Sequence, residues 1–180
     1  MIKTDVKFGI ITGIGICAWI LTEYLLGFHT TRLSVGQYSS YFAVAIPLVT
    51  LYFGIREKRD NYYGGKITVG AGIRTGLMIS VISAIITTIF LIIYYNYINP
   101  DFIQIGLALQ KHRMLVTGRT EMEIAKEMEK IREIFSFTHQ LLYGILSTLG
   151  IGFMLSLAFS VLLKKNKASR YSVFQHLWFF

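Results

Sequence analysis

The chain has 180 residues, of which 53% are hydrophobic, and it carries a formal net charge of +8. Soluble domains are apolar over about 45–50% of their residues on a count that includes glycine, so this composition argues against an ordinary soluble protein. In a soluble protein the excess of cations would indicate nucleic acid as a partner. Here the cations flank long apolar blocks, as the positive-inside rule of membrane proteins describes, and we expect no nucleic-acid partner. The single cysteine, Cys17, excludes an internal disulfide.

Four apolar blocks follow one another along the chain. The predicted membrane spans cover about residues 8–28, 38–55, 77–95 and 141–163. A helix needs roughly 20 apolar residues to cross a bilayer, which these blocks approach or reach. Pro47 interrupts the second block and predicts a kink there. We therefore expect an all-α integral membrane protein, a four-helix bundle that forms a single domain over residues 1–167.

The polar segment between the third and fourth blocks, residues 99–137, is predicted to form an extracytoplasmic amphipathic helical hairpin. Asn99 is the predicted cap of its first helix, and Gly118 marks the turn. Thr120 and Glu123 match a capping box at the start of the second helix. An apolar stripe at helical spacing should face the first helix or the membrane; it consists of Ile124, Met128 and Ile131.

The distribution of Lys and Arg predicts the orientation. Eleven of these residues lie in the N-terminus, the loop after the second block and the C-terminal tail, and seven lie on the opposite side. Because cytoplasmic segments carry the excess of cations, both termini should be cytoplasmic and the hairpin should lie outside. The tail, residues 168–180, alternates aromatic and polar residues and is expected to rest at the cytoplasmic interface, with a frayed terminus as the alternative.

Two ladders of small side chains recur at every fourth position of the third and fourth blocks. Their members are Gly72, Gly76, Ser80, Ala84 and Thr88, and Gly144, Thr148, Gly152, Ser156 and Ser160. Small residues let two helix backbones approach closely, so we expect these helix-packing faces to meet. The helices would run antiparallel, which places Gly76 near Ser156 or Ser160. Towards their other ends, Thr88 would lie near Thr148 or Gly144. One ladder could instead form a seam to a second copy or to another subunit.

Glu23 is a carboxylate inside the first block, about one turn from its outer end. Such a group is costly in lipid and usually faces a partner or a water-filled cavity. His139 opens the fourth block at a similar depth, so Glu23 and His139 form a candidate intramembrane polar pair. Because histidine titrates near neutral pH, the pair could bind a proton or a cation. A purely structural hydrogen bond, or Glu23 reaching the headgroups, is the alternative.

A basic cluster follows the second block on the predicted cytoplasmic side. Its members are Arg56, Lys58, Arg59, Lys66 and Arg74. Cations at this level attract anionic lipid headgroups, so the cluster is a candidate headgroup site. The same residues would also be sufficient merely to fix the topology.

A series of short motifs carries a family resemblance. In chain order they are Gly54-Ile55-Arg56, Arg59-Asp60, Gly64-Gly65, Gly76 and Tyr94-Tyr95-Asn96-Tyr97-Ile98-Asn99-Pro100-Asp101-Phe102. With these motifs the chain resembles an uncharacterised four-helix membrane protein family common in Bacteroidetes, domain-of-unknown-function family 4199, over about residues 5–166. The resemblance implies the inner (cytoplasmic) membrane of a bacterium and supplies no activity.

The motifs of common enzyme classes are missing from the sequence. It has no His/Cys cluster at metal spacing, no GxSxG nucleophile motif and no GxxxxGK[ST] phosphate loop. We therefore expect no metal, no cofactor and no enzymatic activity. The sequence favours a scaffold or accessory subunit that acts through helix–helix contacts, with the lipid bilayer, itself or another membrane subunit as partner. The alternative is a small proton- or cation-linked transporter or channel using Glu23 and His139.

Overall fold

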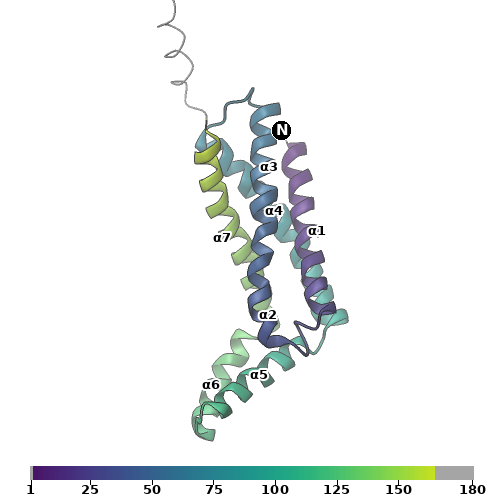
Figure 1. Ribbon diagram of the computed structural model, residues 1–180, viewed down its shortest axis with the longest axis vertical. Coiled ribbons are helices and arrows are strands. Elements are labelled where there is room, and N and C mark those ends of the chain that lie inside the picture. The colour runs from purple at the N-terminus through teal and green to yellow at the C-terminus, as the bar shows by residue number, and fades with distance from the viewer. Residues whose placement is uncertain (1, 165–180) are drawn as a thin grey trace, which may run out of the picture.

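The structure, a computed structural model, describes residues 2–164, and every regular element in that range is a helix (Figure 1). In chain order the elements are α1 (Ile2–Leu25), α2 (Leu33–Ser39), the 3₁₀ turn η1 (Ser40–Val44), α3 (Ala45–Asn61), α4 (Val69–Ile93), the π-helical turn η2 (Tyr94–Ile98), α5 (Phe102–Val116), α6 (Glu121–Ile134) and α7 (Phe137–Leu163). The predicted all-α class is confirmed. The predicted interfacial tail, 168–180, lies outside the described residues.

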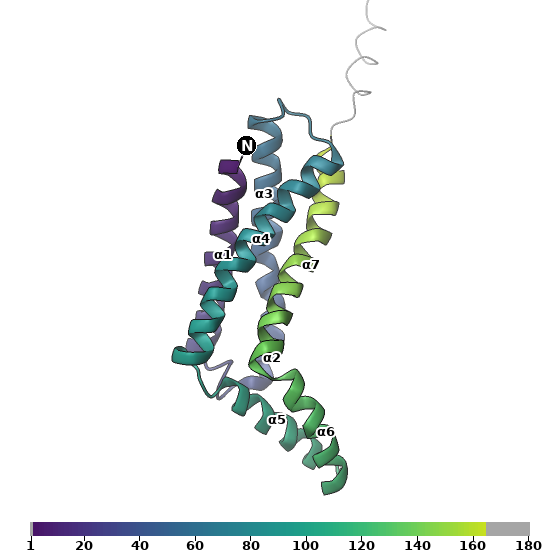
Figure 2. The ribbon, with the colours of Figure 1, turned by 180° about the vertical axis from the view of Figure 1, so that it is seen from behind.

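Four long helices, α1, α3, α4 and α7, run side by side, and α5 and α6 project from one end of them as a hairpin (Figures 1 and 2). We call this the hairpin end. The start of α1, the end of α7 and the loop over residues 62–68 lie together at the opposite end, which we call the loop end. Gly64 and Gly65 turn this loop with positive φ angles of 59° and 83°, which glycine adopts without steric cost.

Three helices of the described chain are long and apolar enough to cross a membrane. They cover Lys3–Leu25, Val69–Ile98 and Phe137–Leu163. The segment predicted as a further span, 38–55, is not one helix of spanning length, because it is divided among α2, η1 and α3. Length and composition therefore define an all-helical chain with three candidate membrane spans.

The interruption in this segment precedes Pro47 rather than centring on it. The 3₁₀ turn η1 ends at Val44, and Pro47 is the third residue of α3. A proline is tolerated in the first turn of a helix because its missing N–H needs no intrahelical partner there. The chain thus changes its helical geometry just before the proline, so that α3 starts anew with Pro47 in its first turn.

The small faces of α4 and α7 meet in the antiparallel register that the ladders predict. A Cβ atom added to Gly72 would lie 2.8 Å from the Cβ of Ser160, and one added to Gly76 would lie 2.5 Å from the Cβ of Ser156. Real Cβ atoms essentially never approach so closely, so any larger residue at these positions requires the two helices to move apart. Towards the hairpin end the ladders open, since Gly144 faces Leu91 instead of Thr88.

The hydroxyl groups on this seam are satisfied within their own helices. Ser80 donates to the carbonyl of Gly76, Ser156 to that of Gly152, and Ser160 to that of Ser156. Each bond returns to the residue one turn earlier, which leaves the hydroxyl with no need of a partner on the other helix. The seam therefore depends on close packing rather than on interhelical hydrogen bonds.

Helix α4 packs against α1 through a second close approach. An added Cβ would lie 2.6 Å from the Cβ of Ile82 at Gly9 and 2.9 Å from the Cβ of Ile86 at Gly13. The step of four residues on both helices shows that α1 and α4 run parallel. Figure 2 shows α4 crossing obliquely, from α7 at the loop end to α1 at the hairpin end.

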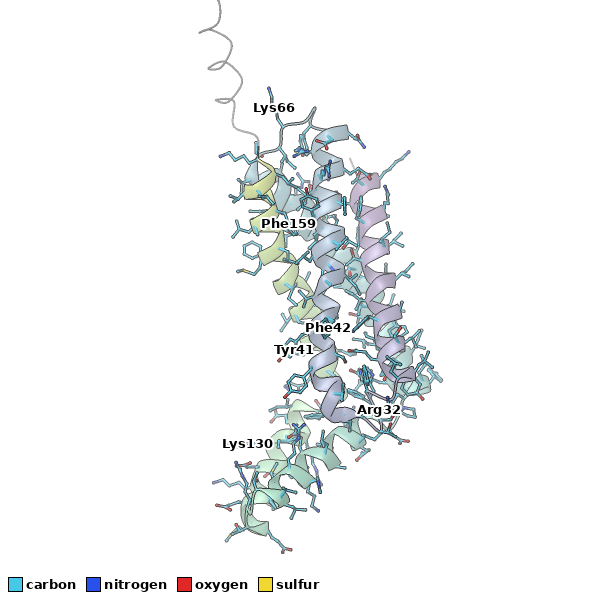
Figure 3. All side chains as sticks on the ribbon, viewed as in Figure 1. Arg32, Tyr41, Phe42, Lys66, Lys130 and Phe159 are labelled. Carbon is cyan, nitrogen blue, oxygen red and sulfur yellow. The ribbon has the colours of Figure 1, made fainter. Side chains whose placement is uncertain are left out.

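Apolar side chains fill the space among the helices towards the loop end. Phe8, Leu51 and Ile79 form one buried cluster, with contributions from α1, α3 and α4. Phe159 of α7 lies between α7 and α3 (Figure 3), where its ring meets that of Tyr52 edge-on at 5.5 Å. The core is thus shared by all four long helices.

The helical hairpin has the two helices and the capping box that its sequence predicts. Thr120 Oγ1 accepts a hydrogen bond from the Glu123 N–H, and the Glu123 carboxylate accepts one from the Thr120 N–H at 2.9 Å. The hydrogen bonds that the Glu123 carboxylate accepts from the Thr120 N–H and hydroxyl lower its pKa below the ordinary value. In the apolar stripe, Ile124 is buried and lines, with Met128, a groove shared with α5.

Two glycines of α7 provide a matched test of the α4–α7 seam. Gly152→Ala would place a Cβ 2.6 Å from that of Ser80, whereas Gly150 has no heavy atom within 4 Å of an added Cβ. We expect Gly152→Ala to destabilise the fold by about 1–3 kcal/mol through overpacking. Gly150→Ala should be neutral or stabilising, because alanine favours helix over glycine. Unfolding in detergent micelles measures both, and equal stabilities would contradict the seam.

Candidate functional site

A buried carboxylate lies at the hairpin end of α1. Glu23 is 3% exposed, and its Oε1 accepts a hydrogen bond of 2.5 Å from Ser39 Oγ at the end of α2. Its Oε2 lies 3.4 Å from His29 Nε2. A charged group can be buried at this depth only if it is paired and hydrogen-bonded, and Ser39 and His29 meet both needs.

The turn after α1 brings these partners back to Glu23. Gly27 has a positive φ of 77°, and its carbonyl accepts the Arg32 N–H at 2.7 Å. This closed turn reverses the chain directly after α1, so that residues 28–39 pass over its last turn. His29 and Ser39 thereby face a carboxylate that precedes them by only six and sixteen residues.

A second set of hydrogen bonds connects this turn to the end of α4. His29 Nδ1 lies 2.7 Å from the hydroxyl of Tyr94, and Asn99 Nδ2 donates to the same hydroxyl at 3.1 Å. Tyr94 is 1% exposed and Asn99 4%. The Tyr94 hydroxyl thus connects Asn99 to His29, and the other nitrogen of the His29 ring lies beside the Glu23 carboxylate.

Aromatic rings enclose this chain of hydrogen bonds. The His29 ring meets Tyr94 edge-on at 5.8 Å and Phe102 at 5.3 Å, and Tyr24 meets Tyr94 at 5.9 Å. Since Phe102 is the first residue of α5, the cluster joins α1, α4 and the hairpin. We refer to Glu23, His29, Ser39, Tyr94 and Asn99 as the polar cluster.

The predicted pairing of Glu23 with His139 is wrong. His139 lies in the first turn of α7, where its Nδ1 is 3.0 Å from Ser136 Oγ and its N–H donates to the same oxygen. It is exposed and serves the start of its helix, while the α1–α2 turn encloses Glu23. Asn99 also differs from expectation, since it binds Tyr94 and leaves the start of α5 to Asp101, which makes no side-chain cap.

A second buried ion pair lies at the loop end. Lys58 Nζ donates to Asp5 Oδ1 at 2.6 Å and to Oδ2 at 2.5 Å, and both residues are 4% exposed. The expectation that Lys58 binds lipid headgroups is therefore wrong, because α1 already supplies its partner. A more exposed pair, Lys7 with Glu57 at 2.6 Å, lies beside it and also joins α1 to α3.

The other members of the predicted basic cluster lie at the loop end, where Arg59 is largely covered and the rest are exposed. Arg59 donates two hydrogen bonds to the Asp60 carboxylate, of 2.7 and 3.0 Å. These bonds raise the pKa of the Arg59 guanidinium above its ordinary value. Arg56 is 3.8 Å from the same carboxylate. Lys66 and Arg74 are exposed, and Figure 3 shows Lys66 projecting from the loop end. Within residues 2–164 no group of three or more His, Cys, Asp or Glu residues could hold a metal ion.

An all-helical chain with three apolar helices of spanning length and buried polar ties at both ends is consistent with a membrane protein. A family model described as "Protein of unknown function (DUF4199)" matches residues 7–165, so the chain belongs to that family and the resemblance is confirmed. Neither the curated proteins nor the solved structures contain a match to the chain.

The hydroxyl of Tyr94 provides a direct test of the polar cluster. Tyr94→Phe removes the partner of both His29 Nδ1 and Asn99 Nδ2 and leaves these groups buried. We expect a loss of about 1–3 kcal/mol in the free energy of unfolding, the cost of unpaired buried polar groups. Tyr97→Phe is the control, since Tyr97 is 81% exposed. Equal effects of the two substitutions would contradict the cluster.

Breaking the buried ion pair of Asp5 with Lys58 should cost more stability than replacing both of its partners. Asp5→Asn leaves Lys58 charged and buried, and should cost about 3–5 kcal/mol of stability. The double replacement Asp5→Leu with Lys58→Met should recover most of this loss, because two apolar groups need no partner. Lys7→Met breaks the exposed pair and should cost at most about 1 kcal/mol. Chemical unfolding measures all three, and a harmless Asp5→Asn would refute the buried pair.

Proposed function

We propose that the chain is a multi-pass protein of a bacterial inner membrane, with four spans and both termini in the cytoplasm. Besides the three candidate spans, the second span in chain order would combine η1 and α3, which follow each other without a break. This proposal is supported by Leu48, Val49 and Phe53, apolar side chains of α3 that are about half exposed. Similar exposed apolar side chains lie on α1, α4 and α7, as expected of a bundle whose surroundings are lipid. The excess of Lys and Arg at the loop end supports its cytoplasmic location.

Within this membrane protein we assign the function of a non-enzymatic scaffold or accessory subunit. The observation that carries the assignment is the projecting hairpin, whose two helices pack mainly on each other (Figures 1 and 2). Its tip exposes large apolar side chains, with Val116 72% and Met122 82% accessible. Since the hairpin is amphipathic and too polar to span, such side chains outside the bilayer favour contact with a partner protein.

A proton- or cation-linked transporter is the second candidate. The polar cluster favours it, because Glu23 and His29 place a carboxylate and an imidazole together in a buried position. Glu23, His29, Ser39, Tyr94 and Asn99 all have partners, however, and they lie at one end of the helices. Bracing of the α1–α2 turn against α4 and α5 accounts for these contacts, so the scaffold remains the better-supported function.

Substitution of the hairpin tip tests the scaffold function. Purification in mild detergent, with mass analysis of the associated chains, should yield a stoichiometric partner for the wild type. Val116→Asp with Met122→Asp should reduce that partner about tenfold or more, because each buried apolar side chain contributes about 1.5–3 kcal/mol. Glu121→Gln, an exposed change at the same tip, should retain it. A protein that purifies as a monomer without a partner, and that shows proton- or cation-linked uptake abolished by Glu23→Gln, would favour the transporter.

A further inference from the structure

An open groove runs along the surface between α1 and α3 at the loop end. It has a volume of about 470 Å³, within the range of about 300–1,000 Å³ that ligand sites occupy. Its inner part is lined by apolar side chains, among them Ile11, Val49 and Phe53. Its outer part, towards the loop, is lined by Arg56 and Asp60. The groove therefore changes from apolar to charged over roughly 10 Å, given a helical rise of about 1.5 Å per residue.

The groove lies on the outer side of the contact between α1 and α3, whose inner side is closed by apolar packing of Phe8 against Leu51. Thr12 Oγ1 donates to Thr50 Oγ1 at 2.7 Å, and the pair of Asp5 with Lys58 lies nearer the loop end. Their other sides pack on α4 and, for α3, also on α7. The side chains of Ile11, Val49 and Phe53 are left about half exposed along the groove. In a bilayer such a groove faces acyl chains, which match its apolar surface.

At the outer part of the groove, Arg56 is held by a long ion pair with Asp60. Glu57 accepts from Lys7 at 2.6 Å, and Asp60 accepts two hydrogen bonds from Arg59, so both carboxylates are neutralised by neighbours. Arg56 is half exposed, and its distance of 3.8 Å from Asp60 is too long for a hydrogen bond. A guanidinium presents five N–H donors in a geometry that suits the oxygens of a phosphate. The outer part of the groove thus complements one anionic phosphate.

We infer that the groove binds one phospholipid of the bilayer, with an acyl chain along Val49 and Phe53 and the phosphate on Arg56. This inference rests on the proposed membrane location. The ligand is assigned as a phospholipid because a single molecule then satisfies both parts of the groove, apolar at depth and anionic at the headgroup level. A phosphate alone would leave the apolar part bare, and a neutral diacyl lipid would offer no phosphate to Arg56.

Native mass spectrometry of the full chain tests the site. The protein is released from detergent after incubation with phosphatidylglycerol or with a diacylglycerol of the same acyl chains. We expect one phosphatidylglycerol to be retained, and diacylglycerol to be retained about tenfold less, since charge-assisted hydrogen bonds to the phosphate are lost. This comparison uses the wild type and needs no variant to fold. Equal retention of the two lipids, or retention of neither, would overturn the site.

Two pairs of variants locate the bound lipid. Val49→Trp fills the apolar part and Arg56→Gln removes the cation, and each should lower phosphatidylglycerol retention about tenfold. Val161→Trp on the exposed surface of α7 and Lys3→Gln, an exposed cation of α1 at the loop end, are the matched controls and should retain the lipid. Equal losses in variants and controls would mean a nonspecific lipid shell and would overturn the inference.

Alkaline carbonate extraction of membranes separates this inference from the one on which it depends. A chain that stays in the membrane but retains no phospholipid contradicts the groove alone. A chain that is extracted by carbonate contradicts the membrane location, and the lipid site with it.

Discussion

The arrangement of the long helices depends on how closely α4 approaches two neighbours at once. At the loop end its small face meets α7, where Gly76 admits the side chain of Ser156. Further along, its isoleucines fill the space opposite Gly9 and Gly13 of α1. In lipid there is little hydrophobic drive between helices, so van der Waals contact at short range supplies much of the association energy. Helix α4 is therefore the element that α1 and α7 share.

Buried polar groups complement this packing at the two ends. The polar cluster braces the α1–α2 turn against α4 and α5, while Asp5 and Lys58 join α1 to α3 at the loop end. A polar group removed from water is costly unless it is paired, so each of these ties favours one arrangement over others. On the outer side of the contact between α1 and α3 lies the groove in which we place a phospholipid.

Features that depend on local periodicity could be predicted from the sequence, while those that depend on the path of the chain could not. The ladder that includes Gly76 recurs at every fourth residue, which fixes the helix face on which it lies. The capping box at Thr120 is a local pair three residues apart, which marks the start of its helix. The partner of Glu23 depends on a turn at Gly27 that reverses the chain, and depth along the helices alone favoured the wrong histidine. Lys58 and Asp5 are 53 residues apart, and no local pattern links them.

The most direct test of α4 as the shared helix is a crosslink between α4 and α7 within one chain. Cysteines replace Gly72 and Ser160 in a Cys17→Ser background, where an added Cβ at Gly72 lies 2.8 Å from that of Ser160. A disulfide spans about 3.5–4.5 Å between Cβ atoms, which a shift of about 1 Å between the helices provides. Oxidation in membranes should give a crosslinked monomer. A disulfide formed only between two chains would show that the small faces meet across an interface and not within the fold.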